Sequence, residues 1–531
     1  MLMQPRSWTP SPRRFLAHVQ RGVRGPAGVA GKGWLAAVGW FNRLGLSENA
    51  ILIGFAVAIG AVGALGVVAF YKLIDLAHAA LFRWPLTTAP QLEYQAYRPL
   101  LTAAGIAAAW WVMRRLGHGH EGLNVPDVQL AVARRGGDIP TRPALARTAA
   151  SAITLGSGGS AGSEGPVAVL GSTVGSFLGR VFRFDSTRVK VLVGAGAAAG
   201  ISAAFNAPLA GAFFALEEIL GSFAVSAFPP VVVASVVAAV VSHAFFGNHP
   251  ALEIPTEYGY ALAREVFLFY PLLGVLLGLV SVAFVRCYFG TETALSRLRI
   301  PAAALPWLGG VVVGVLVLAS GDLLVGYGHL AIRLEVFGRM PWFFLALLAF
   351  GKILATSITL NAGGSGGVFT PSLYVGAAAG GAFGVALDAL FPGLGLHPEA
   401  YALVGMGAVV AGATHAPITG ILIVFEMTND YAIVLPLMLT TVLAYLVARQ
   451  IEPDSLYSGW LRRRGEHLEQ GADRDVLAGV RVGAAYDPNP QVIGEGARIA
   501  ELLEQLDRVE QTDFPVIDDR RRLVGIISLS E

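Results

Sequence analysis

Several stretches of this sequence carry no Asp, Glu, Lys or Arg over the length of a bilayer span, and the clearest are Ile51–Phe70, Phe223–Phe246 and Ile353–Leu387. About 20 predominantly apolar residues are enough for a helix to cross the hydrocarbon core of a membrane. Only 14% of the 531 residues are charged, whereas soluble proteins carry about a quarter. These features predict an all-α, multi-span integral membrane protein that is surrounded by a lipid bilayer.

Basic residues gather at the two ends of the apolar region. Arg462–Arg464 follow its last segment, and a second group precedes the first span, made of Arg6, Arg13, Arg14, Arg21, Arg24 and Lys32. Because Lys and Arg accumulate on the cytoplasmic side of membrane proteins, we expect both termini to face the cytoplasm of a bacterial-type plasma (inner) membrane. The formal net charge of +2 gives no reason to expect a nucleic-acid partner.

Composition divides the chain into three regions. Residues 1–45 are basic and rich in Pro and Gly, residues 46–465 form the apolar transmembrane body, and residues 475–531 are polar, as in a soluble segment. The single cysteine, Cys287, excludes an intrachain disulfide and a cysteine-based metal site. We interpret it as a small buried side chain within a span.

The apolar body contains an internal repeat, with halves of about 50–245 and 265–460. SEGPVAVLGSTVGSFLG in the first half aligns with GVFTPSLYVGAAAGGAFG in the second, which places Pro166 opposite Pro371 at an offset of 205 (371 − 166 = 205). Further on, FNAPLAGAFFALEE resembles THAPITGILIVFEM. Duplicated halves that are interrupted by Gly and Pro at matching places are typical of transporters with a site at the repeat interface.

The glycines of these halves follow two patterns. Gly171, Gly175 and Gly179 are four residues apart, a spacing that is typical of closely packed membrane helices. The denser clusters GSGGSAGSEG and NAGGSGG contain too many glycines to remain helical, since each Gly costs about 1 kcal/mol relative to Ala. Non-helical backbone at membrane depth is tolerated only where protein or a water-filled path satisfies its polar groups.

Each dense cluster is followed by a proline that opens an apolar, helical run, at Pro166 and at Pro371. Pro is favoured in the first helical turn because its missing N–H would have no partner there. The residues just before each proline therefore present free backbone N–H groups, at a helix end that carries roughly half a positive charge. Two such starts, one from each half, predict an anion site that needs no Lys or Arg.

Glu164 is the only charged residue between Thr148 and Gly179. An ionised carboxylate in the middle of a membrane costs roughly 2.5–3.5 kcal/mol on insertion scales, so it indicates a function. We expect the carboxylate to occupy the anion site when ionised and to leave it when protonated, which makes protons and anions compete through one side chain. The alternative is a structural carboxylate that caps its helix.

A second chemistry remains open at the first glycine cluster. GGSAG, with Ser160 at its centre, matches the G-x-S-x-G turn of nucleophilic serines, so an intramembrane serine hydrolase is an alternative. GGSGG repeats the pattern around Ser365 (365 − 160 = 205). Because a hydrolase needs only one nucleophile, this duplication favours a structural role for the two serines over acyl transfer. His118 and His120 lack the further ligands that a metal site needs, and no cofactor is expected.

Several ordered motifs resemble the CLC family of chloride channels and chloride/proton antiporters. GSEGP (Gly162–Pro166) is similar to the family's GREGP, and GVFTP (Gly367–Pro371) to its GxFxP. SAAFNAPLAGAFFALEE and THAPITGILIVFEM match family segments almost residue for residue, while GLNVP takes the place of GSGIP and SLYS that of the tyrosine motif. The resemblance covers about residues 50–460. It implies an inverted-topology repeat with broken and tilted helices, assembled as a homodimer with one anion pathway per subunit.

The resemblance also implies roles for individual residues. Glu164 takes the position of the gating glutamate, which blocks the outer anion site and exchanges protons. The backbone amides of Val368 and Phe369 would hold the central anion, with the Tyr457 hydroxyl beside them. Gly165, in the same motif as Glu164, belongs to the expected anion-binding set.

Glu218, with Glu217 next to it, falls where antiporters of this family carry the internal proton-transfer acid that its channels usually lack. Glu218 therefore favours chloride/proton exchange, with chloride and protons as the transported partners. A passive anion channel of the same fold and an exchanger for another anion are the alternatives. A structural interpretation of Glu218 is a cytoplasm-facing acid at a helix end, because exposed charge costs little.

Three positions depart from the family pattern. Leu123 stands where the family has an anion-coordinating Ser, which removes a hydrogen bond typically worth about 0.5–1.5 kcal/mol. Asn124 replaces a Gly and brings an amide to the inner vestibule. Ser163 replaces the Arg of GREGP and removes a positive charge near the outer entrance. Chloride is the expected anion, and these three changes bear on its selectivity.

The soluble segment resembles part of a CBS domain. It predicts a helix followed by two strands, Val516–Asp518 and Val524–Ser528, with a charged turn between them. CBS motifs work in pairs and this segment holds about one, so either the module continues outside this sequence or a second subunit supplies its pair. The family uses the module for dimer contacts and adenine-nucleotide regulation, but one incomplete motif gives little reason to expect a nucleotide.

Overall fold

The computed structural model describes residues 48–83, 91–117, 123–247, 263–326, 340–466, 468, 490–498 and 513–528. The basic segment 1–45 lies outside the described residues, as do His118 and His120. The chain divides into two compact units, Met1–Leu468 and Glu469–Glu531. The first unit contains the apolar body and the second contains the polar segment.

The first half of the apolar body is almost entirely helical. Its helices are α3 (Glu48–His78), α5 (Gln91–Leu116), α6 (Val125–Arg134), α7 (Thr141–Gly156), α8 (Glu164–Val181), α9 (Ser186–Phe205), α10 (Pro208–Phe214) and α11 (Phe228–Phe246). Two π-helical turns, η1 (Ala79–Arg83) and η2 (Ala215–Leu220), follow α3 and α10 directly. Such turns are rare and frequently occur at functional sites, and η2 carries both Glu217 and Glu218.

The second half repeats this order of helices. Its members are α12 (Ala263–Arg297), α13 (Leu305–Ala319), α15 (Trp342–Asn361), α16 (Phe369–Leu390), α17 (Pro398–Thr414), α18 (Pro417–Thr428), α19 (Val434–Ile451) and α20 (Ser458–Arg463). Helix α16 begins 205 residues after α8 (369 − 164 = 205), and α18 begins 209 residues after α10 (417 − 208 = 209). The repeat that the glycines and prolines predict is therefore present in the order of the helices.

The helices have the length and surface of membrane spans. Among the described residues, seven helices are long and apolar enough to cross a bilayer. Large apolar side chains on their outer faces are exposed, for example Leu65, Val240 and Leu347, which lipid tails accommodate and water does not. The prediction of a mostly helical, multi-pass membrane protein is confirmed.

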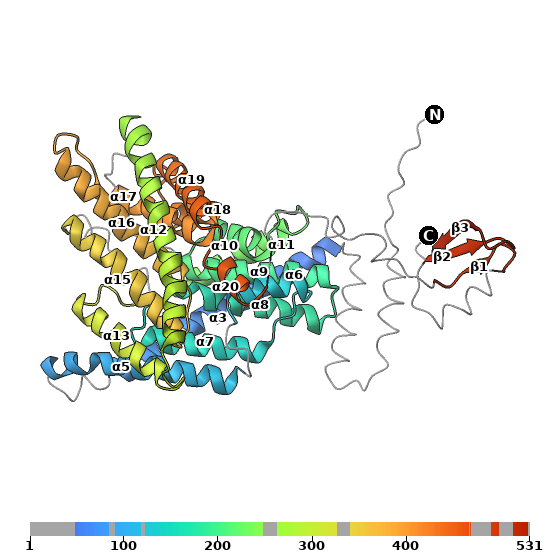
Figure 1. The fold of residues 1–531 in the computed structure, drawn as a ribbon, viewed down its shortest axis with the longest axis horizontal. Coiled ribbons are helices and arrows are strands. Elements are labelled where there is room, and N and C mark those ends of the chain that lie inside the picture. The colour runs from blue at the N-terminus through green and yellow to red at the C-terminus, as the bar shows by residue number, and fades with distance from the viewer. Residues whose placement is uncertain are drawn as a thin grey trace. The chain divides into compact units, whose positions relative to one another are not determined.

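The uncharged window Ile353–Leu387 is a broken helix and not a single span. Helix α15 ends at Asn361, the glycine-rich residues between it and α16 are not helical, and α16 begins at Phe369. Helix α8 likewise begins at Glu164 after a non-helical stretch that follows α7 (Figure 1). Both helices start two residues before their proline and in the protein interior, because Glu164 and Phe369 are fully buried.

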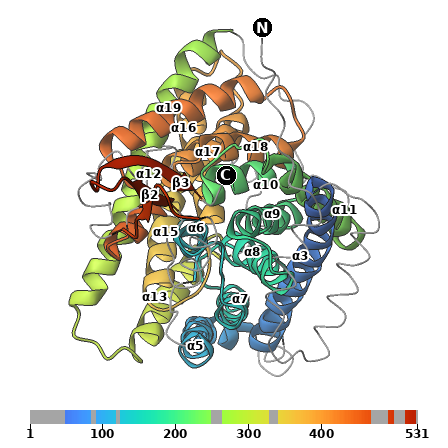
Figure 2. The ribbon, with the colours of Figure 1, turned by 90° about the vertical axis from the view of Figure 1, so that its right-hand side faces the viewer.

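Close helix packing explains the regularly spaced glycines. Helix α8 lies against α9, and α16 lies against α17 (Figure 2). A Cβ atom at Gly171 would lie 2.0 Å from the carbonyl oxygen of Gly196, and one at Gly376 would lie 2.1 Å from that of Gly405. No side chain fits at that distance, so these glycines hold the helix pairs together, as their spacing predicts.

The second unit contains a three-stranded sheet in the order β1 (Ile493–Gly494), β2 (Asp513–Ile517) and β3 (Leu523–Ser528). β1 pairs with β2 in parallel, and β2 pairs with β3 antiparallel. The pKa of the Asp518 carboxyl lies below its ordinary value, chiefly because the Arg522 backbone N–H donates to it in the turn. The sequence predicts the second strand well but places the first too late, since β2 begins at Asp513.

Candidate anion site

The two non-helical stretches meet at a single backbone bridge. The Gly162 N–H donates to the Gly367 carbonyl at 2.8 Å, and the Gly367 N–H donates to the Gly162 carbonyl at 2.8 Å. The two glycines occupy the same position in the two halves (367 − 162 = 205). The bridge brings the starts of α8 and α16 together in the protein interior, although they belong to different halves of the chain.

Serine hydroxyls tie each non-helical stretch to a helix of the opposite half. Ser160 shares a hydrogen bond with the Thr356 hydroxyl at 3.0 Å, and Ser365 shares one with the Ser151 hydroxyl at 2.7 Å. All four residues are buried, and both partners follow the 205-residue offset (365 − 160 = 205; 356 − 151 = 205). The duplicated G-x-S-x-G pattern therefore has a structural explanation, in which Ser160 bonds to a threonine and not to a base.

The Glu164 carboxylate reaches from α8 to the start of α16. Its Oε1 accepts the Phe369 backbone N–H at 2.6 Å, and its Oε2 accepts the Thr370 hydroxyl at 2.8 Å. The residue is 0% exposed. The carboxylate therefore caps the helix of the other half, at the N-terminal end where backbone amides and the helix dipole favour negative charge.

Two glycines make room for this carboxylate. A Cβ atom at Gly162 would lie 2.1 Å from Glu164 Oε2, and one at Gly367 would lie 2.1 Å from Glu164 Oε1. Real Cβ atoms do not approach other heavy atoms so closely, so a side chain at either position would displace the carboxylate. Gly162 and Gly367 therefore have two roles. Their backbones join the two helix starts, and their missing side chains leave room for the Glu164 carboxylate.

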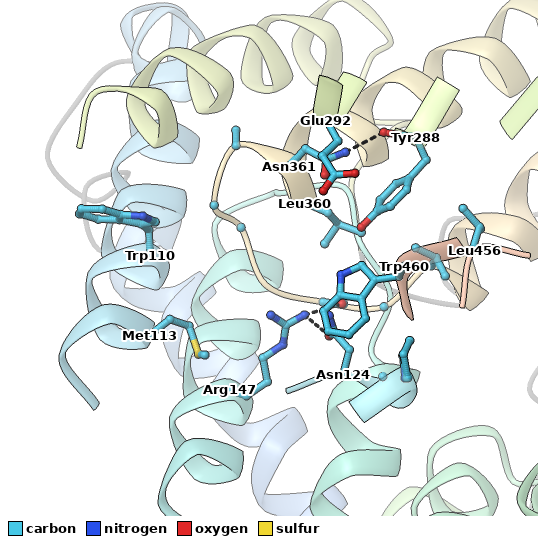
Figure 3. Close-up of a pocket in the computed structure, with 18 of the residues that line it drawn as sticks. Trp110, Met113, Asn124, Arg147, Tyr288, Glu292, Leu360, Asn361, Leu456 and Trp460 are labelled. Atoms are coloured by element: carbon cyan, nitrogen blue, oxygen red, sulfur yellow. Dashed lines mark hydrogen bonds between the residues drawn. The ribbon is translucent and has the colours of Figure 1, made fainter. Parts of the chain in front are cut away.

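A cavity of about 340 Å³ lies next to these helix starts (Figure 3). Four of the predicted site residues line it, namely Asn124, Gly165, Val368 and Tyr457, and so does Arg147. Leu123, Glu164, Glu218 and Phe369 are not among its lining residues. Tyr457 is buried just before α20.

Arg147 is a buried cation that sequence analysis did not single out. It lies on α7, is 6% exposed, and donates through Nη2 to Asn124 Oδ1 and to the Gly366 carbonyl, the latter at 3.1 Å. Figure 3 shows its guanidinium turned toward Asn124 beside Trp460. A buried cation therefore lies beside the cavity, and the expectation of an anion site without Lys or Arg stays a prediction.

Lys352 occupies the matching position in the second half (352 − 147 = 205). It is 2% exposed, and its Nζ donates to the carbonyls of Leu324 and Val325 at 3.2 and 3.0 Å. A signal for both cations was present in the sequence, because a charge at the same repeat position of two apolar helices is expensive to keep in a membrane and indicates a role.

Glu218 is buried on η2, with 2% of its surface exposed. The Gln129 side-chain amide donates to the Glu218 carbonyl at 2.8 Å and to its carboxylate Oε2 at 3.0 Å. The interpretation of Glu218 as an exposed, cytoplasm-facing acid is wrong, because burial makes an ionisable group costly unless it is bonded or serves a function.

Comparison with known proteins decides the family. The family profile described as voltage gated chloride channel matches residues 105–449. The chain belongs to the CLC family. A ClcB-like protein of Ralstonia nicotianae, named as a chloride channel protein, is 35% identical over 389 residues, covering 71% of this chain and 88% of its own. The H⁺/Cl⁻ exchange transporter ClcA of Vibrio parahaemolyticus is 35% identical over 316 residues, 58% of this chain and 67% of its own.

Solved CLC structures have the same fold. A slow cyanobacterial Cl⁻/H⁺ antiporter superimposes with a TM-score of 0.69 at 25% identity, covering 79% of this chain and 98% of that one. A eukaryotic CLC transporter superimposes with a TM-score of 0.66 at 21% identity, covering 90% and 87%. The chain is therefore a CLC anion-transport protein and not an enzyme, which removes the hydrolase alternative for Ser160. The family profile does not extend to the polar segment.

Within this CLC fold, the acid next to Glu218 has a structural role. The Glu217 carboxylate accepts the backbone N–H groups of Ile418 and Thr419 at 3.1 and 2.8 Å, at the start of α18. Glu426 does the same for the start of α10, where it accepts two backbone N–H groups at 2.8 and 2.6 Å. The two acids are repeat partners (426 − 217 = 209), so each caps a helix of the opposite half.

Proposed function

We propose that this chain exchanges chloride for protons, with Glu164 as the group that both ions use. The observation that carries this proposal is the position of the Glu164 carboxylate on the amide of Phe369 and the hydroxyl of Thr370. An anion attracted to the same helix start would compete with this carboxylate. Protonation removes the negative charge and with it the attraction, so the acid leaves and an anion takes its place.

The amides at the start of α16 would hold the central anion. Val368 borders the cavity and Phe369 donates to Glu164, so both lie at the helix end that the acid caps. The Tyr457 hydroxyl would complete this site from the side of α20, together with the backbone of Gly165. Arg147 and Lys352 add positive charge at matching positions, which lowers the cost of an anion in the membrane interior.

Glu218 would carry protons between the cytoplasm and Glu164. Its burial and its bond to Gln129 support this role. Relatives of this chain are named as exchangers and as a channel, so a passive anion channel is the second candidate.

Flux through purified protein in liposomes tests the exchange. A chloride gradient should drive protons uphill in the opposite direction. Glu164→Gln should abolish proton movement while chloride passes independently of pH, and Glu218→Gln should abolish proton movement while chloride still passes. Chloride flux without proton movement in the unmodified protein would instead establish the channel, and the absence of chloride flux would contradict both candidates.

The assembly and the end segments complete the proposal. A homodimer with one pathway in each subunit would place residues 46–465 in an inner-membrane position, with residues 1–45 and 475–531 in the cytoplasm. The β2–β3 hairpin supports a partial CBS module in the polar segment. Such a module would contribute dimer contacts, and an adenine nucleotide is its conceivable ligand by family resemblance.

A further inference from the structure

A basic pocket lies between α12, the end of α19 and α20, and it holds about 260 Å³. Its charged lining residues are three arginines and two acids, namely Arg286, Arg462, Arg463, Glu452 and Asp454. Val285 and Phe289 give it an apolar wall, and both are buried. None of these residues lines the anion cavity, so the basic pocket is a separate feature that the proposed exchange does not use.

The arginines of the basic pocket are more exposed than the acids that pair with them. Arg286 Nε donates to Glu452 Oε2 at 3.0 Å, and the two side chains are 61% and 22% exposed. Arg462 pairs with Asp454, and these side chains are 56% and 15% exposed. The acids therefore lie deeper, the guanidinium groups lie on the open side, and the lining contains one cation more than it contains acids.

Most of the guanidinium donors in the basic pocket are unused. Arg286 pairs through Nε and Arg462 through Nη2, while Arg463 uses Nη1 to reach Glu292 at 3.3 Å and lies over the Phe289 ring at 4.6 Å. Within the described part of the chain, the other guanidinium nitrogens of these three residues have no hydrogen-bond partner. The planar fork of an arginine matches the geometry of carboxylate and phosphate oxygens.

The basic pocket adjoins an exposed face of α12. The members of this face are three or four residues apart, at Leu272, Leu276, Leu279, Ala283, Arg286 and Gly290. Because this spacing follows the turns of a helix, they form one continuous stripe about 27 Å long, close to the thickness of the hydrocarbon core of a bilayer. Arg286 and Gly290 lie at one end of the stripe, where a span meets the lipid headgroups, and both line the basic pocket.

We infer that the basic pocket binds the phosphate of an anionic phospholipid. The arginines would hold the phosphate oxygens through charge-assisted hydrogen bonds, and an acyl chain would lie along the apolar stripe of α12. Basic pockets between transmembrane helices bind anionic headgroups in this way. A free phosphate would use the same donors but would gain nothing from the stripe, which is why we assign the site to a lipid. The inference is independent of which ions the protein exchanges.

Titration of the purified full-length protein in a neutral detergent with phosphatidylglycerol tests the inference, with bound lipid measured by native mass spectrometry. Phosphatidylcholine has the phosphate and the chains but no net charge, and glycerol phosphate has the charged phosphate but no chains. Each should bind about tenfold more weakly than phosphatidylglycerol. Arg286→Gln combined with Arg462→Gln removes two guanidinium groups and should weaken phosphatidylglycerol binding by about tenfold, the effect of one lost charge-assisted bond.

Gly290→Phe tests the same site without a change of charge. A Cβ atom at Gly290 would meet nothing within 4 Å, so the ring fits on the folded helix, fills the pocket and should weaken phosphatidylglycerol binding to a similar degree. If the double arginine variant does not fold, Gly290→Phe decides the question alone.

Arg180→Gln is the matched control. Its side chain is 42% exposed and pairs with Asp138 at 2.9 Å, as Arg286 pairs with Glu452, but it lies on α8 and outside the basic pocket. Its affinity for phosphatidylglycerol should equal that of the unmodified protein. Unchanged affinity in a folded pocket variant overturns the inference. Glycerol phosphate that binds as tightly as the lipid also overturns it, and would show a site for free phosphate instead.

Discussion

Glu164 owes its position to residues without side chains. A Cβ atom at Gly162 or at Gly367 would lie only 2.1 Å from one of its carboxylate oxygens. The acid accepts two hydrogen bonds from α16 and none of its surface is exposed. The amide, the hydroxyl and the helix end offset part of the cost of taking a carboxylate out of water.

Gly162→Ala should therefore open the site without unfolding it. The added methyl group would meet three atoms of the Glu164 carboxylate, the flexible end of a side chain, and the carboxylate can move away at low cost. We expect faster chloride flux with weaker proton coupling, because the acid is displaced from the helix start that an anion uses. Liposome flux with a pH electrode measures both quantities.

Gly290→Ala is the control for this change. It adds the same methyl group to α12, where nothing lies within 4 Å, and flux and coupling should match the unmodified protein. Unaltered flux and coupling in Gly162→Ala would contradict the placement of the carboxylate between the two glycines.

Residue-level prediction succeeded where a signal is local. Glu164 is conspicuous in the sequence because it is the only acid in a long uncharged stretch. Arg147 is less conspicuous, because its contact with the Gly366 carbonyl forms only through the pairing of the two halves. A buried partner that lies 219 residues away in the chain leaves no trace in local composition.

At the scale of helices, the residues at which helices begin were easier to predict than the contacts between helices. Pro166 and Pro371 indicate the starts of α8 and α16 because proline restricts the first turn. The π-helical turn η2 and the hydroxyl ties of Ser160 and Ser365 could not be predicted, since they depend on which helices pack together. The offset of 205 residues predicts that a helix of one half corresponds to a helix of the other half. It does not predict the hydrogen bonds that join the two halves.

Variants of the helix caps Glu217 and Glu426 distinguish acids with a structural role from the proposed proton carrier, Glu218. Glu217→Gln and Glu426→Gln should each lower the free energy of unfolding by about 1 kcal/mol, the usual contribution of an N-terminal cap, and leave proton coupling intact. Thermal unfolding in detergent and liposome flux measure the two effects. Glu218→Gln is the contrasting variant, which should lose proton movement. Loss of coupling in Glu217→Gln would show that this acid also carries protons.

At the scale of the molecule, the inverted repeat places the two caps on related surfaces of α10 and α18, which contact each other. Glu217 and Glu426 are only half-buried, and Leu209 and Ile418 beside them are 46% and 37% exposed. Half-buried carboxylates are poorly tolerated against lipid. A second copy of the chain would cover this surface, in line with the proposed homodimer.

Thiol cross-linking tests this interface. Cys287 is the single native cysteine, so Cys287→Ser provides a background without thiols, and Ile418→Cys then introduces one thiol on the surface of α18. In a two-fold dimer the same patch faces itself, so a short bismaleimide should convert most of the protein in native membranes into a covalent dimer. Leu65→Cys, at an exposed position on α3, should stay monomeric because it would face lipid. Equal cross-linking at the two positions would mean that α18 faces lipid as well, and the caps Glu217 and Glu426 would then need another explanation.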